Sequence, residues 1–508
     1  MKKRLIQLAA IIAALAIVLT GAGRIPAPPA ANISFAQAAS LRAGPAYINV
    51  SFDFGGKSYT TYSIGKDNGL FGNALMFTID PIYINAACSL TDASGRNALS
   101  GDPYCESKPN RYDGREEGHV TPVRNQGGTS LCWAFSTISA IETYILKHHG
   151  TEESLSQANM AYALSNQISE QGYHRGIADG GSFTMAMAYA TRWEGPVSFD
   201  EDPFHEHIGS KHRTIQENDK PTTWHVQGFQ NIEADFDAIK DGIMKYGSVL
   251  SPIYTDEQEG NNRESRYYNP ETGAHYNPYA LESNHCVQIV GWDNDYEAKN
   301  FNTDPGQNGA WIVKNTWGSG FGDNGYLYVS YKDALFGSTA YAVTDIQPVN
   351  NYDNIYMYDT FGQVGSMNYG TDTVWFANTF NPESANEKLA AVSFFSPDSD
   401  VSYEIYFGED FSSKTLAAWG QIGNSGYYTV PIYSEALLKD GFTVFIKFSI
   451  DYDGVACIPI EANVPNYITT AASEPGQSYV SWDGNDWTDI TSIIPNGNVC
   501  IRVFTLEQ

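Results

Sequence analysis

Cys132 closely follows Gln126, and this pair has the placement of a thiol nucleophile and its oxyanion donor. Apolar residues recur at helical intervals over residues 132–147, with Ser130 as the expected N-cap and Gly150 as the expected end. Cys132 would therefore lie at a helix N-terminus, where the helix dipole favours a thiolate over a thiol. A lone cysteine is more often a buried structural residue, so the prediction depends on its partners.

A histidine and an asparagine later in the chain supply those partners. His285 stands at the head of an apolar, strand-like run, and Asn315 follows a second strand-like run, residues 311–314. In chain order, the cysteine, histidine and asparagine provide a nucleophile, a base and an amide that orients the base. Each residue alone would more often be structural, so the predicted catalytic site rests on their combination.

Residues 109–345 resemble the papain family of cysteine peptidases. The motifs that carry the resemblance are residues 121–127, 132–135, 179–181, 284–285, and 314–318 with 325–326. In that order they are similar to the family's entry to the active-site loop, nucleophile, substrate-binding glycine pair, general-base strand and asparagine strand. The implied fold is α+β, a papain-like two-subdomain peptidase with a helical left half and a β-barrel-like right half.

The resemblance also implies a role for each matching residue. The implied catalytic residues are Cys132 as the nucleophile, His285 as the base, Asn315 as its orienter and Gln126 as the oxyanion donor. Gly180 and Gly181 would bind the substrate backbone, and Trp317 would shield the histidine–asparagine hydrogen bond. The implied S2 wall falls near residues 249–253. The expected substrates are proteins or peptides, and no cofactor is expected.

Two departures from the family pattern concern the cleft. Thr129 and Ala178 stand where the family has a pair of bonded cysteines, so the cleft loses a disulfide that typically contributes about 2–4 kcal/mol. His285 and Asn315 lie near and beyond the expected range of about 130–150 residues after the nucleophile. Residues 254–283 are the expected insertion, a long loop beside the cleft that restricts access of substrate.

Composition bounds the number of domains and the class of partner. With 508 residues, 42% of them hydrophobic and 17% charged, the chain can form two or three cores. The net charge of −28 argues against nucleic acid or an anionic membrane surface as a partner. No metal is expected, because residues 205–207 lack the histidine spacing of zinc peptidases and residues 293–295 lack the glycine and glutamate of a calcium loop.

Residues 1–23 have the order of regions found in a secretory signal peptide. Basic residues 2–4 precede an apolar run, and small residues end it at Gly23. A second small-x-small site at Ala38 would extend the signal to residue 38. The signal predicts a secreted or cell-surface protein, which contacts the membrane only if the segment remains as an uncleaved anchor.

The segments on either side of the peptidase region are rich in β patterns. In residues 24–108, a hairpin pattern at 48–54 and 57–64 indicates either a β-rich accessory or an inhibitory propeptide of unusual type. Residues 351–508 contain short alternating runs that predict an antiparallel β-sandwich; these include residues 372–377, 403–407 and 442–448. This region resembles the lectin-like domain that follows papain-type peptidases in some exported prokaryotic proteins. Residues 482–487 either present aromatic faces to a glycan or form a turn with packed tryptophans.

The chain contains six cysteines. If Cys132 is a free nucleophile, an odd number remains, so at least one more is unpaired. Cys286, next to His285 on an apolar strand, is the expected unpaired residue, and Cys88–Cys105 and Cys457–Cys500 are expected local bridges.

The sequence therefore predicts a secreted papain-like cysteine endopeptidase with a C-terminal β-sandwich. Two alternatives remain open. One is an adhesin or carbohydrate-binding protein in which the peptidase domain is only a scaffold, although the intact glutamine, cysteine, histidine and asparagine argue against it. The other is a peptide ligase or amidase that uses the same triad.

Overall fold

The structure is a computed structural model. It describes residues 49–54, 57–61, 99–104, 107–205, 208, 220–256, 265–434, 436–451 and 454–508. The predicted signal peptide, most of residues 24–108 and the predicted Cys88–Cys105 bridge lie outside the described residues. Along the described part of the chain, no helix is both long enough and apolar enough to cross a membrane.

Helices form one half of the peptidase region. They are α2 (Cys132–His149), α3 (Gln157–Ala163), α4 (Phe183–Thr191) and α5 (Phe236–Tyr246). α2 is buried over most of its length, and α2, α3 and α4 contact one another. The predicted end of α2 is confirmed, because Gly150 follows it in the left-handed conformation, with φ of 69°, that favours glycine at this position.

The start of α2 differs from the prediction. The N-cap residue is Leu131 rather than Ser130, and no side chain caps the first turn. Ser130 lies one residue further from the helix, and its N–H donates to the carbonyl of Ala178 at 2.9 Å. The serine thus joins the helix entry to the segment before the glycine pair. The first-turn N–H groups of α2 remain without a capping side chain, as in helix termini that bind anions.

The other half of the peptidase region is a sheet. Its strands are β3 (Arg111–Asp113), β4 (Trp224–Ile232), β5 (Val249–Ile253), β6 (Tyr268–Asn269), β7 (Ala274–His275), β8 (His285–Asp293), β9 (Ala310–Lys314), β10 (Tyr326–Ser330) and β11 (Ala340–Pro348). β8 pairs antiparallel with β5 and β9, which places His285 opposite Ile253. The predicted insertion is not wholly a loop, since β6 and β7 pair within it and β7 pairs with β10.

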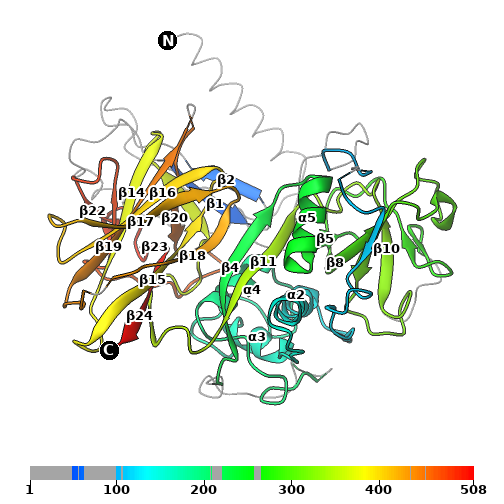
Figure 1. Ribbon diagram of the computed structural model, residues 1–508, viewed down its shortest axis with the longest axis horizontal. Coiled ribbons are helices and arrows are strands. Elements are labelled where there is room, and N and C mark those ends of the chain that lie inside the picture. Colours follow the sequence, from blue (N-terminus) through cyan, green and yellow to red (C-terminus); the bar gives the residue numbers. More distant parts are fainter. Residues whose placement is uncertain are drawn as a thin grey trace, which may run out of the picture. The chain divides into compact units, whose positions relative to one another are not determined.

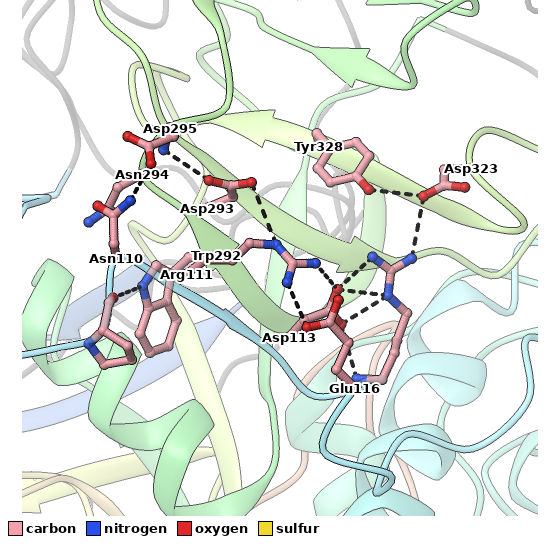
Figure 2. A network of polar contacts seen from close by, with 12 residues as sticks. Asn110, Arg111, Asp113, Glu116, Trp292, Asp293, Asn294, Asp295, Asp323 and Tyr328 are labelled. Carbon is pink, nitrogen blue, oxygen red and sulfur yellow. Dashed lines mark hydrogen bonds and ion pairs between the residues drawn. The ribbon is translucent and has the colours of Figure 1, made fainter.

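Arg111 and Arg115 fasten β3 and the turn after it to β8 and β10, at the end of β8 away from His285. Figure 2 shows Arg111 between Asp113 and Asp293, the last residue of β8. Both guanidinium groups bind the buried carboxylate of Asp113, at 2.9 and 2.7 Å. Arg115 also lies 3.4 Å from Asp323, which accepts a hydrogen bond from Tyr328 at 2.9 Å. β8 is therefore held at its far end as well as along both edges.

The peptidase sheet continues into the C-terminal domain. β18 (Gly426–Pro431) pairs antiparallel with β4, with Gly426 opposite Gln230 and Tyr427 opposite Phe229. Within the described residues this single sheet has 13 strands. Figure 1 shows the consequence, with β18 and β15 of the C-terminal domain lying beside β4 and β11. A buried core of apolar side chains also includes residues from both domains.

The C-terminal domain is an antiparallel β-sandwich, as predicted. Its share of the large sheet also contains β12 (Asn354–Tyr356), β15 (Glu387–Ser396) and β24 (Ile501–Glu507). A six-stranded sheet contains β14 (Thr373–Phe380), β16 (Val401–Gly408), β17 (Thr415–Ile422), β19 (Phe442–Ile450), β21 (Ser478–Ser481) and β22 (Thr488–Asp489). Apolar side chains from both sheets share one core. β14, β16 and β19 confirm the three strands predicted from alternation.

A third sheet joins the N-terminal hairpin to the C-terminal domain. It contains β1 (Asn49–Phe54), β2 (Lys57–Thr61), β13 (Gly365–Asn368), β20 (Ile458–Glu461) and β23 (Asn498–Val499). The hairpin prediction is confirmed by the antiparallel pairing of β1 with β2, and β1 also pairs with β13. Two short 3₁₀ helices, η6 (Ala298–Asn300) and η7 (Ile490–Ser492), complete the described elements.

Two expectations for the C-terminal domain have clear outcomes. The predicted Cys457–Cys500 disulfide is wrong, because both thiols are free. Counting cysteines cannot test whether two side chains approach with the geometry that a disulfide needs. Residues 482–487 form the turn with packed tryptophans, since Asp483 accepts from the N–H groups of the turn and Trp487 packs against Phe445 at 5.4 Å between ring centroids.

Candidate active site

The Cys132 side chain contacts the imidazole of His285 and the thiol of Cys286 at the first turn of α2. The cysteine is only 8% exposed. The hydrogen bond with Cys286 is the largest influence on the pKa of Cys132, and together with the contact to His285 it holds that pKa well below the usual value despite burial. The pKa of Cys286 is raised, first by the same hydrogen bond and then by burial. Both directions favour the thiolate at Cys132 over the thiolate at Cys286.

His285 is oriented by two residues that follow β9. Its Nε2 atom lies 2.8 Å from Oδ1 of Asn315, and the ring stacks on Trp317 with 4.6 Å between centroids. Both His285 and Asn315 are buried. Oδ1 of Asn315 also accepts from the N–H of Thr316 at 2.8 Å, and this fixes the amide with its oxygen toward the histidine. The other imidazole nitrogen is left to face Cys132.

Gln126 is held next to this group by the segment that follows β9. Its backbone N–H donates to the carbonyl of Thr316 at 2.8 Å, and its side-chain Oε1 accepts from the Thr316 hydroxyl at 2.5 Å. The Nε2 atom donates one hydrogen to the carbonyl of Thr129 at 2.6 Å. An amide nitrogen carries two hydrogens, so Gln126 retains a second donor.

The glycine pair is positioned by Trp133 and Arg175. A Cβ atom on Gly181 would lie 2.5 Å from a ring atom of Trp133, so only glycine fits. The buried Arg175 guanidinium lies over the Trp133 ring at 4.8 Å and donates to the carbonyl of Gly180 at 3.0 Å. It also donates to the carbonyls of Asp179, Ile177 and Ala161. Burial lowers the pKa of Arg175 to about 10, which still leaves it charged near neutral pH.

The C-terminal domain contacts both ends of the glycine-pair segment. Before the pair, the N–H of His174 donates to the carbonyl of Tyr467 at 2.8 Å, and the Tyr173 and Tyr467 rings are 5.0 Å apart. After the pair, the Tyr467 hydroxyl is hydrogen-bonded to the side chains of Ser182 and Thr184. The wall of the cleft thus depends on a residue from another domain.

A buried cation lies behind Asn315. Lys314 donates from Nζ to Ser139 at 2.6 Å and to Thr121 at 3.1 Å, and Thr121 donates to the Glu142 carboxylate at 3.0 Å. Burial lowers the pKa of Lys314 to about 8, and burial raises the pKa of Glu142. This network ties β9, which Asn315 directly follows, to α2, which begins at Cys132.

The structure thus brings Cys132, His285, Asn315, Gln126 and Trp317 together, and it packs Gly181 of the glycine pair against Trp133 of α2. Sequence reasoning missed Arg175 and Tyr467, since neither belongs to a motif. It predicted Cys286 only as an unpaired cysteine, although the position of this residue next to His285 was a signal that it lies at the site.

Comparisons with known proteins agree with this arrangement. Residues 108–345 match the model of the papain family cysteine protease, and residues 355–505 match that of the lectin like domain. Cathepsin J of Mus musculus is 28% identical over 277 residues, which cover 54% of this chain and 74% of that protein. Procathepsin L of Mus musculus is 30% identical over 238 residues, 46% of this chain and 64% of that protein. The chain spans 59–75% of the length of such relatives.

Solved structures extend the similarity to both domains. The cysteine protease and lectin-like domains of Cwp84, a surface layer associated protein of Clostridium difficile, match with a TM-score of 0.70 and 26% identity. The match covers 79% of this chain and 89% of that one. A second structure of Cwp84, after propeptide cleavage, matches with a TM-score of 0.70 and 25% identity, over 78% of this chain and 99% of that one.

The fold is thus a papain-like peptidase followed by a lectin-like β-sandwich. Residues 108–345 form a papain-family cysteine peptidase domain, and residues 355–505 form a lectin-like domain.

Proposed function

We propose that the chain is an exported endopeptidase that hydrolyses peptide bonds of proteins through Cys132, His285 and Asn315. The observation that carries this proposal is the Cys132 thiol with its lowered pKa against His285, whose far nitrogen lies 2.8 Å from Asn315. A thiolate is the nucleophilic form of cysteine, and an imidazolium is the acid that a departing amine requires.

In the first half of the reaction, the Cys132 sulfur attacks the scissile carbonyl and forms a C–S bond. The oxyanion accepts hydrogen bonds from the Cys132 N–H and from the second amide hydrogen of Gln126. The Cys132 N–H is free for this because a first-turn amide has no intrahelical acceptor. His285 then gives its proton to the leaving nitrogen, and the C–N bond breaks.

In the second half, His285 takes a proton from water, which attacks the thioester and releases the acid and the Cys132 thiolate. Asn315 keeps the imidazole of His285 in one orientation for both proton transfers. Trp317 covers the hydrogen bond between His285 and Asn315. Gly180 and Gly181 hold the substrate backbone on the opposite wall of the cleft.

Residues 1–23 support export by a signal peptide, and the Cwp84 similarity supports a surface or secreted location. N-terminal sequencing of the exported protein would locate the processing site. A new terminus at Arg24 is expected for cleavage after Gly23, and a terminus at Ala39 would indicate the longer signal. A terminus near Pro109 would identify residues 24–108 as a removed propeptide, and its absence would support the accessory interpretation.

A peptide library analysed by mass spectrometry tests the activity. New N-termini that appear with the wild-type chain and disappear with Cys132→Ala are the expected result. Joined peptides would instead indicate a ligase, and released ammonia without backbone cleavage would indicate an amidase. No product at all would leave the scaffold alternative, and glycan-array binding by the intact Cys132→Ala chain would then be its test.

A further inference from the structure

A cavity of about 810 Å³ lies between the peptidase and lectin-like domains. Its walls come from α4, β4 and β11 on one side and from β15 and the turn before β18 on the other. The volume is within the range of about 300–1,000 Å³ that is usual for ligand pockets. No residue of the proposed catalytic machinery lines it.

After the glycine pair, the cavity lining starts three residues further along the chain. Ser182 caps α4 directly after Gly181, and Thr184 in the first turn of α4 lines the cavity. Tyr341, another lining residue, contacts the ring of Phe183 at 5.6 Å. A chain bound along Gly180 and Gly181 and extended past the start of α4 would therefore enter the cavity.

The direction of the substrate follows from the proposed chemistry. His285 must lie beside the leaving amine, so the part of the substrate after the scissile bond passes the histidine and Trp317. The acyl part, which precedes the scissile bond, then runs along the glycine pair. Residues upstream of the bond are thus the ones that reach the cavity.

The cavity has a rigid floor, because a backbone ladder crosses it from one domain to the other. β4 pairs with β18, and the N–H of Asn231 donates to the carbonyl of Ser425 at 2.9 Å. The Thr429 hydroxyl also donates to the carbonyl of Gln227 at 2.8 Å. A preformed site of this kind spends little binding energy on ordering itself.

The cavity is lined by aromatic rings and by negatively charged carboxylates. The rings are those of Tyr173, Phe229, Tyr341, Phe395 and Tyr467. The exposed carboxylates are Glu233 from the peptidase domain and Asp400 from the lectin-like domain, and among the described lining residues none is a lysine, arginine or histidine. A long cationic side chain suits such a lining, since its stem covers apolar surface while its charge faces rings and carboxylates.

We propose that this interdomain cavity binds peptide-substrate residues upstream of the scissile bond and prefers lysine or arginine there. The lectin-like domain then takes part in selecting the substrate. This inference rests on the proposed peptidase function for its biological meaning, but the binding step can be tested without turnover.

The test uses the full-length Cys132→Ala chain and three fluorescent peptides. One peptide reaches only the glycine pair, and two carry an identical upstream extension with either lysines or glutamates. We expect the lysine peptide to bind about fivefold more tightly than the glutamate peptide at low salt, with the difference shrinking as salt is added. Asp400→Asn combined with Glu233→Gln should remove most of that difference.

Trp419→Ala is the matched control, because Trp419 is a 75% exposed residue of the lectin-like domain that does not line the cavity. It should leave the lysine preference unchanged. Equal affinity for the three peptides, or a preference that survives the double substitution, would overturn the inference. Failure of the proposed function is a separate result, seen when the wild-type chain cleaves none of the three.

Discussion

The two walls of the cleft are held by different kinds of bonds. The histidine wall, formed by His285, Asn315 and Trp317, lies at the ends of β8 and β9, whose backbones are fixed by a sheet that is paired on both sides. The glycine wall, residues 173–184, is irregular before α4 and depends on side chains that reach its carbonyls. Substitutions in the histidine wall should therefore mainly change kcat, and substitutions in the glycine wall should mainly change KM.

The glycine wall also shows how the missing disulfide is replaced. Thr129 and Ala178 stand in place of bonded cysteines, and the Ser130 N–H bound to the Ala178 carbonyl keeps these segments together. Arg175 adds donors along the same stretch, and Tyr467 fixes its two ends from the lectin-like domain. Polar contacts, some of them from the second domain, thus hold the segments that the family resemblance would join by a disulfide.

On the histidine wall, Asn315→Ala should reduce kcat by about 10²-fold while KM changes little, since it disturbs proton transfer and leaves the glycine wall intact. Steady-state kinetics on one fluorogenic peptide would measure both constants. A loss confined to KM would show that Asn315 acts in binding rather than in orienting His285.

On the glycine wall, Arg175→Ala should raise KM by about tenfold, equivalent to about 1.4 kcal/mol, with a smaller change in kcat. The substitution removes the Arg175 donor from the carbonyls of Ile177, Asp179 and Gly180. The KM of Arg175→Lys should fall between those of the wild type and Arg175→Ala, because an ammonium cannot bridge the same set of carbonyls.

The double substitution Thr129→Cys with Ala178→Cys tests whether Arg175 positions the loop. If the new disulfide forms in the Arg175→Ala variant, it should return most of the raised KM toward the wild-type value. The same disulfide in the otherwise wild-type chain should change KM little. A disulfide that forms without restoring KM would contradict the positioning role and point to general destabilisation.

Cys286→Ala should move the acid limb of Cys132 reactivity to higher pH. The hydrogen bond from Cys286 lowers the pKa of Cys132, so its removal raises that pKa and reduces the thiolate fraction at mildly acidic pH. The pH dependence of iodoacetamide alkylation at Cys132, read by peptide mass spectrometry, measures the shift. Cys286→Ser retains a donor and should shift less, whereas Cys457→Ala in the other domain should not shift the profile.

Tyr467→Phe should have the smallest effect, a rise of about twofold in KM, because it removes one hydroxyl and keeps the ring against Tyr173. Short and extended peptides should be affected alike if the hydroxyl only braces α4. An unchanged KM would confine the support of the glycine wall to Arg175 and the backbone contact at His174.

Local patterns allowed much of the peptidase region to be predicted. The helix after Cys132 and its end at Gly150 follow from apolar spacing and one glycine, and the strands of the sandwich follow from alternation. The residue types at the site were recognisable because their motifs are short and contiguous. The roles of Gln126 and of the triad stay predictions until they are measured.

Long-range contacts were not predictable in this way. The pairing of β4 with β18 joins segments about two hundred residues apart, as does the contact of Asn231 with Ser425. Alternation reports that a strand exists but not which strand it joins. Arg175 is a single arginine in an irregular stretch, so nothing in its neighbourhood marks it as the donor to the glycine pair.

The same limit explains the cysteine results. The odd count correctly left Cys286 unpaired, but it gave no account of its contact with Cys132. The predicted Cys457–Cys500 pairing was wrong because the number of cysteines says nothing about the distance between two of them.

Active-site titration with a thiol-reactive epoxide tests the central claim most directly. We predict that one equivalent attaches to Cys132, that the loss of peptidase activity follows the extent of labelling, and that Cys132→Ala takes up none. Labelling at another cysteine, or full activity in a chain whose Cys132 is completely labelled, would contradict the assignment of Cys132 as the nucleophile.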